Sequence, residues 1–198
     1  MRNCFLYVNV GVNGRISDGG VFRECKLSKA MMENKLNFPR PMPLPARELK
    51  VPFVVVADDA FPLLPNLLKP YSQRGLSHDC RIFNYRLSRA RRVIENAFGI
   101  LANRFRVLLN PINLSANKTE TITLACVVLH NFLATRSVSY VEITPEELAT
   151  NKLETLLPQR GNRPSNHALQ VREEFKNFFC SVEGSVPWQE NSIANYDM

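Results

Sequence analysis

The sequence predicts an α/β protein in which helices cover both faces of a mixed sheet. Residues 5–11 (FLYVNVG) are rich in aromatic and β-branched residues and end at a glycine, which predicts a first strand at the start of the chain. Residues 51–57 (VPFVVVA) are apolar almost throughout, which is typical of a strand buried on both faces. Residues 86–106 carry apolar side chains at helical spacing, which predicts a long amphipathic helix.

Shorter patterns predict the elements between these segments. Residues 18–20 (DGG) are typical of a turn, and the apolar spacing over 21–36 predicts a helix. Four prolines within residues 39–45 exclude a helix or a central strand there, because proline cannot donate a backbone hydrogen bond. Residues 72–80 are polar and are predicted as a loop.

Two further helices complete the predicted fold. One begins at Asn117, with Glu120 three residues later as a capping box, and the other begins near Asn166. We therefore divide the chain into a domain over 1–135, a polar linker over 136–165, and a C-terminal helix and tail over 166–198.

Composition excludes several classes of protein. The 198 residues are 45% apolar and 22% charged, which is ordinary for a globular chain and excludes general disorder. No apolar run approaches the roughly 18 residues of a membrane-spanning helix, and the N-terminus predicts no secretory signal. Five scattered cysteines are typical of free thiols in a reducing, intracellular compartment. No phosphate-binding loop is present, so we expect no nucleotide cofactor.

Positive charge is concentrated in one part of the chain. The 25 Lys and Arg residues outnumber the 18 Asp and Glu residues, giving a net charge of +7. Residues 81–106 hold seven arginines and one acid, Glu95, so this window alone carries +6. Such a window is either a solvated helix face or the binding surface of a polyanion such as DNA. Arginine suits phosphate because its guanidinium group makes paired hydrogen bonds.

Two carboxylates stand out from this background. Asp58 follows the predicted buried strand directly, and Glu95 lies on the basic helix. Carboxylates from a strand end and a helix can together bind Mg²⁺ or Mn²⁺, which activates water in phosphodiester cleavage. Each residue also has a simpler interpretation. Asp58 can cap the turn before Phe61, and Glu95 can pair within its helix with Arg91 or Arg92.

Longer motifs are similar to those of a known family. The segments that carry the similarity are ADDAFPL (57–63), FNYRLSRARRVIENAFG (83–99), RFR (104–106), LHNF (129–132), GRISDGGVF (14–22) and the tail from REEF (172–175) to EGSVPWQ (183–189). Together they cover nearly the whole chain and resemble the Harbinger-type DDE transposases and the transposase-derived nucleases. The helical block over 83–105 is the most specific of them.

This resemblance implies an RNase H-like fold and a divalent-metal-dependent endonuclease, a hydrolase acting on phosphodiester bonds of DNA. It implies that Asp58 and Glu95 are catalytic metal ligands, with Asp18 as a further metal-ligand candidate. The Asp18 position recurs in the family, as part of a turn or as a support of the site. His130, in the LHN motif, is interpreted as a core residue.

The first catalytic aspartate of the family has no counterpart in this sequence. Counting back from Asp18 places it just before Met1, so the chain resembles a fragment that starts inside the catalytic domain. We therefore expect it to be inactive or nearly so as a nuclease. The alternative function is that of a non-catalytic, domesticated module that binds DNA or a protein.

Expected partners and location follow from these functions. DNA is the expected partner, with Arg89, Arg91 and Arg92 as phosphate contacts, and a separate DNA-binding protein is a further candidate. A DNA partner favours the nucleus as the location, with the cytoplasm as the alternative.

Overall fold

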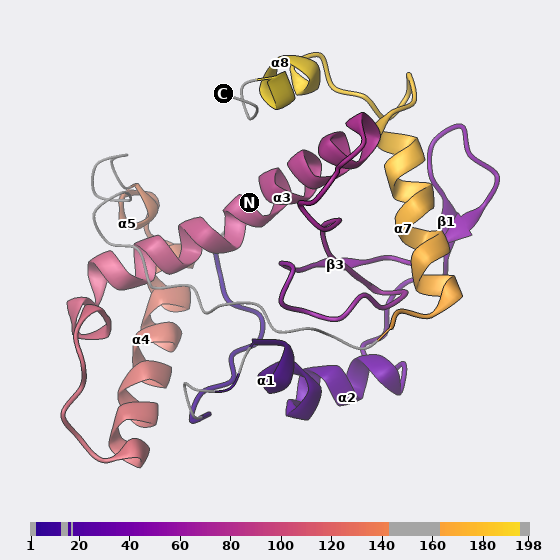
Figure 1. Cartoon of the computed structure of the whole chain (residues 1–198). Helices are drawn as coiled ribbons and strands as arrows, with labels where there is room; N and C mark the ends of the chain where they lie inside the picture. Colours follow the sequence, from indigo (N-terminus) through magenta and orange to yellow (C-terminus); the bar gives the residue numbers. More distant parts are fainter. Residues whose placement is uncertain (1–2, 13–15, 17, 143–162, 195–198) are drawn as a thin grey trace. The chain divides into compact units, whose positions relative to one another are not determined.

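The computed structural model describes residues 3–12, 16, 18–142 and 163–194, drawn in colour in Figure 1. Contacts divide the chain into two compact units, each described here by itself. The first unit comprises Met1–Ile16 and Arg92–Leu156, and the second comprises Ser17–Arg91 and Leu157–Met198. Within the described part, no helix has both the length and the apolar character needed to cross a membrane.

The described residues are mostly helical, with a few short strands, so the α/β class holds with a minor sheet content. The elements are α1 (Asp18–Glu24), α2 (Lys26–Met32), β1 (Met42–Pro43), β2 (Lys50–Val51), β3 (Val55–Val56), β4 (Leu67–Leu68), α3 (His78–Arg104), the 3₁₀ helix η1 (Arg106–Leu109), α4 (Ala116–Arg136), α5 (Val138–Val141), α7 (Asn166–Phe179) and α8 (Gln189–Ala194).

The strand predicted over 51–57 is divided into two. Pro52 has no N–H group, and the flanking strands β2 and β3 pair with different partners. β2 pairs antiparallel with β1, whereas β3 pairs parallel with β4. Ala57 is buried, but Val55 is 39% exposed, so the prediction of a strand buried on both faces is wrong for β3.

The core of the second unit forms where α7 and α3 meet the β3–β4 pair. Leu68 and the α3 residues Phe83 and Leu87 pack in one buried cluster with Ala168 and Val171 of α7. Ser165 caps α7 by accepting a hydrogen bond from the Ala168 N–H at 3.2 Å, which confirms the predicted start of this helix. The C-terminal helix is thus part of the core that holds β3.

The long basic helix begins earlier than predicted. α3 starts at His78, within the segment 72–80 predicted as a polar loop, and ends at Arg104. Ile82 and Tyr85, in its second turn, pack with Ile193 of α8. Tertiary packing by residues far away in the sequence therefore extends the helix beyond its regular apolar stripe.

The first strand predicted at the chain start is not formed in the described residues 3–12. The side-chain amide of Asn131 on α4 takes the place of a neighbouring strand. The Phe5 N–H donates to Asn131 Oδ1 at 2.8 Å, and Asn131 Nδ2 donates to the Phe5 carbonyl at 2.8 Å. The Phe5 ring packs with Ala97 and Leu101 of α3 and with Cys126. The backbone is satisfied, but by a side chain and not by a sheet.

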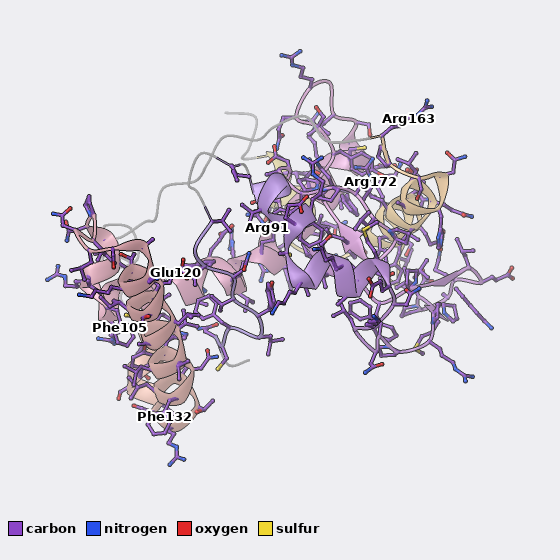
Figure 2. The ribbon with its side chains drawn as sticks, turned by 90° about the horizontal axis from the view of Figure 1, so that it is seen from below. Arg91, Phe105, Glu120, Phe132, Arg163 and Arg172 are labelled. Carbon is purple, nitrogen blue, oxygen red and sulfur yellow. The ribbon has the colours of Figure 1, made fainter. Side chains whose placement is uncertain are left out.

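The capping box predicted at the start of α4 is also absent. Ser115 occupies the N-cap position, one residue before α4 begins at Ala116. The Glu120 carboxylate instead faces Gly11, where a Cβ atom would lie 2.2 Å from Glu120 Oε1. Gly11 has a φ of 86°, a left-handed backbone conformation that favours glycine. Figure 2 shows Glu120 and Phe132 towards opposite ends of α4.

A buried hydrogen-bond chain joins α4, α5 and the N-terminal segment within the first unit. His130 is fully buried; its Nε2–H donates to the Asn3 carbonyl at 2.6 Å, and its Nδ1 lies 3.0 Å from the Tyr140 hydroxyl. Arg104 donates to the carbonyls of Tyr140 and Glu142 at the end of α5. His130 is therefore a satisfied core residue, as predicted.

We expect His130 to make stability depend on pH. Burial lowers the pKa of His130, although its hydrogen bond to Asn3 opposes the shift. In the unfolded chain the imidazole of His130 takes up a proton near pH 6.5, whereas in the folded chain its lower pKa delays protonation to a lower pH. The free energy of unfolding therefore falls as the pH drops below about 6.5. The slope of this loss is at most about 1.4 kcal/mol per pH unit for one proton.

Denaturant unfolding between pH 7.5 and 5 measures this effect. His130→Gln should flatten the pH dependence, whereas His167→Gln, at an exposed position on α7, should leave it unchanged. An equal effect of the two substitutions would contradict the assignment.

Candidate functional site

Asp58 lies in a turn directly after β3, in the second unit. The N–H of Ala57 donates to the Leu68 carbonyl at 2.8 Å, which fixes the end of the parallel pair. Asp58 Oδ1 then accepts the N–H of Ala60 at 3.0 Å and closes a tight turn. The sequence-based interpretation that Asp58 stabilises a turn is therefore correct, and one of its two carboxylate oxygens, Oδ1, does so.

The second oxygen of Asp58 faces a cation from α3. Asp58 Oδ2 lies 3.7 Å from Arg91 Nη2, and the two side chains are 22% and 27% exposed. This separation exceeds the 2.7–2.9 Å of a close charge-assisted hydrogen bond, so the ion pair is loose. On the other side of the turn, the Lys69 ammonium group donates to the Asp59 carbonyl. Burial lowers the pKa of Lys69.

The N-terminus of α1 packs against this turn. A Cβ atom at Gly19 would lie 2.3 Å from the Ala60 carbonyl oxygen, so only glycine permits the approach. The rings of Phe22 and Phe61 meet edge to face, with centroids 5.4 Å apart. The backbone next to Asp18 therefore lies against the Asp58 turn, within one unit.

Glu95 belongs to the first unit, whereas Asp58 belongs to the second. Glu95 is exposed on α3, four residues after Arg91. Residues four apart on a helix are neighbours on one face. In the described part of the chain, no group of three or more His, Cys, Asp or Glu side chains is placed to hold one metal ion. The joint role of Asp58 and Glu95 stays a prediction.

Arginines of the basic window differ in their surroundings. Arg86 donates to the Gly184 carbonyl at 2.8 Å and lies over the Phe179 ring, and burial lowers its pKa. Arg104 is held by carbonyls at the end of α5. Arg89 is exposed and lies 5.1 Å from the Trp188 ring centroid. Arg92 is exposed as well. Two of the arginines on which the prediction of a polyanion partner rested, Arg86 and Arg104, therefore make contacts within the fold.

Sequence reasoning missed two features of the Asp58 turn. Lys69 follows β4 directly, and its position beside the turn depends on the parallel pairing of β3 with β4. Gly19 was interpreted only as part of a predicted turn. Lys69 could have been found from the sequence if residues 67–68 had been predicted as a strand parallel to the one before Asp58. A lysine directly after that second strand would then be expected beside the Asp58 turn.

Comparison of the sequence with models of known protein families shows the class of protein to which the chain belongs. Residues 2–131 match the model of the DDE superfamily endonucleases, which is more than half of the chain. The chain therefore belongs to this family, which confirms the family predicted from its motifs.

A curated relative is the Arabidopsis thaliana protein described as "Protein ALP1-like". It is 31% identical over 185 residues, which are 92% of this chain and 44% of the relative. The chain thus spans less than half the length of this relative. No solved structure matches the chain.

The donor chemistry at Asp58 fits one ligand of a divalent cation. A carboxylate oxygen is the donor that Mg²⁺ prefers, and Asp58 Oδ2 has only a loose ion pair with Arg91. Asp58 Oδ1 is already engaged by the Ala60 N–H. Asp58 can therefore supply one oxygen, and further ligands must come from other carboxylates.

A paramagnetic titration tests whether Asp58 and Glu95 share a cation. We expect Mn²⁺ to broaden the NMR signals of residues near both side chains, because the unpaired electrons of a shared ion relax the nuclei around it. The double substitution Asp58→Asn, Glu95→Gln should abolish this broadening.

Glu33→Gln with Asp79→Asn is the matched control, since both residues are exposed acids. The control should broaden like the wild type. Broadening that persists in the Asp58, Glu95 double variant would refute the shared site.

Proposed function

We propose that this chain is a DNA-acting endonuclease domain of RNase H-like fold. In this proposal, Asp58 and Glu95 would hold Mg²⁺ or Mn²⁺, with Asp18 as a further ligand candidate, and the bound ion would supply activated water for phosphodiester cleavage. The domain extends over 1–135, with the helix within 166–198 completing its core. A DNA partner makes the nucleus the proposed location.

One observation carries this proposal. In a member of an endonuclease family, a parallel strand pair ends in Asp58, and Lys69 and Arg91 contact the same turn. Cations beside a carboxylate attract phosphate groups to it, and their partial burial strengthens that attraction. Arg91 also lies one helical turn before Glu95 on α3, which supports a role for both carboxylates.

Plasmid nicking in the presence of Mg²⁺ or Mn²⁺ tests the activity. Two carboxylates hold one cation, but two-metal cleavage needs ligands that keep two ions ~4 Å apart. We therefore expect little nicking by this chain and strong nicking by a longer chain extended towards the length of its relative.

The extended chain should lose nicking on Glu95→Gln and keep it on Glu33→Gln. Robust nicking by the short chain that depends on Glu95 would overturn the expected inactivity. An extended chain that never nicks would contradict the proposed function itself.

A second candidate function is that of a non-catalytic module that binds DNA. The exposure of Arg89 and Arg92 on α3 favours it, because exposed guanidinium groups can bind phosphate without any metal. This module would use the exposed arginines of α3 and need no metal.

Either function predicts that Arg89 and Arg92 contact DNA phosphates. Each phosphate neutralised releases counterions, which lowers log K by about 0.9 per unit of log salt concentration. Replacing both residues by Gln should weaken duplex binding and flatten that slope by about one to two units. Fluorescence anisotropy over a salt series measures both quantities.

Arg23→Gln with Arg40→Gln removes the same charge from exposed positions outside α3. This control should change the slope less. Equal slopes in the two double variants would show that general charge, and not this helix, binds DNA.

A further inference from the structure

The second unit contains a pocket of about 570 Å³ between α3, the loop that follows Pro70, and α8. Its volume lies in the range of roughly 300–1,000 Å³ that is typical of small-molecule sites. Arg91, which faces Asp58, is part of its wall. The pocket therefore adjoins the Asp58 turn without including Asp58.

One face of α3 provides the polar wall of the pocket. Arg81, Ser88 and Arg91 recur at intervals of seven and three residues, which places them on the same side of the helix. Among the described residues that line the pocket, the two arginines are the charged ones and none is an acid. This composition favours an anion, and guanidinium groups match the geometry of phosphate.

The remaining wall is apolar and aromatic. Leu76 of the loop, Tyr85 of α3 and Ile193 of α8 line the pocket together with the polar residues. A ligand that is anionic at one end and flat and apolar at the other satisfies both walls. A nucleotide has this form, and its base can stack on an aromatic ring or lie against aliphatic side chains.

We propose that this pocket binds a phosphate-bearing nucleotide at the end of a single DNA strand. The identification of the ligand as part of DNA rests on the proposed function, whereas the phosphate site does not. A phosphate bound by Arg81 and Arg91 would lie one side chain away from Asp58. The pocket would thus hold a nucleotide beside the reacting strand and would contribute no ligand to the metal.

Calorimetric titration of the full chain with dAMP, without added metal, tests the pocket. Wild type should bind dAMP, and deoxyadenosine, which lacks the phosphate, should bind at least about tenfold more weakly. Arg81→Gln should raise the Kd for dAMP about tenfold, because it removes a charged hydrogen-bond donor.

Arg74→Gln is the matched control, since Arg74 is exposed in the same loop and does not line the pocket. Its Kd should equal that of the wild type. Ser88→Phe fills the pocket and provides a second test should Arg81→Gln lower the melting temperature. Absence of dAMP binding by the wild type, or equal Kd values for Arg81→Gln and Arg74→Gln, would overturn the proposal.

A short 5′-phosphorylated oligonucleotide identifies the source of the phosphate. Displacement of dAMP by this strand supports a DNA end as the ligand, whereas failure to displace it overturns that part in favour of a free nucleotide. The dAMP titration measures no cleavage, so the two proposals can fail separately. Binding of dAMP by this chain, together with an extended chain that never nicks, would contradict the proposed function alone. Nicking without dAMP binding would contradict the pocket alone.

Discussion

Helix α3 buries two different stretches of its apolar face, and the rest of the structure depends on that burial. Phe83 and Leu87 pack in a cluster with α7 and β4, whereas Ala97 and Leu101 pack with Phe5 and α4. Full burial of a large apolar side chain contributes about 1.5–3 kcal/mol, which exceeds the effect of any single exposed ion pair on this helix. The side chains that α3 exposes are positioned by this packing.

The arginines of α3 differ in how far the fold uses their charge. Arg86 is oriented by the Gly184 carbonyl and the Phe179 ring, and Arg104 by carbonyls at the end of α5. Withdrawing either guanidinium group would break these hydrogen bonds, and at Arg86 it would also take a donor from the partly buried Gly184 carbonyl. Arg89 and Arg92 are exposed, so a ligand can bind them at little cost to the fold.

The sequence predicted features that depend on local periodicity. The helical conformation of α3, the start of α7 near Asn166 and the core role of His130 all follow from neighbours close in the sequence or from residue type. Not every apolar position of the predicted α3 stripe is buried, since Ile94 is 41% exposed. The predicted first strand failed because its backbone partner is Asn131, 126 positions away. The capping box at Glu120 failed for the same reason, because that carboxylate faces Gly11.

The candidate site was predictable in part. The position of Asp58 after a strand follows from the apolar run before it, but its pairing with Arg91 depends on the packing of α3 and could not be predicted. The contact of Gly19 with Ala60 depends on the placement of α1, which no local pattern encodes. Contacts between segments distant in the sequence therefore decide which predicted residues meet.

Arg91 connects the two proposals because it faces Asp58 and lines the pocket that we propose binds a nucleotide. At 3.7 Å from Asp58 Oδ2, its guanidinium group competes for the oxygen that a divalent cation would use. A phosphate in the pocket offers Arg91 a paired, charge-assisted contact that is stronger than this loose ion pair. If both proposals hold, a bound nucleotide draws Arg91 away from Asp58 and exposes the carboxylate to the metal. Nucleotide and metal would then each increase the affinity for the other, because coupling between two sites is reciprocal.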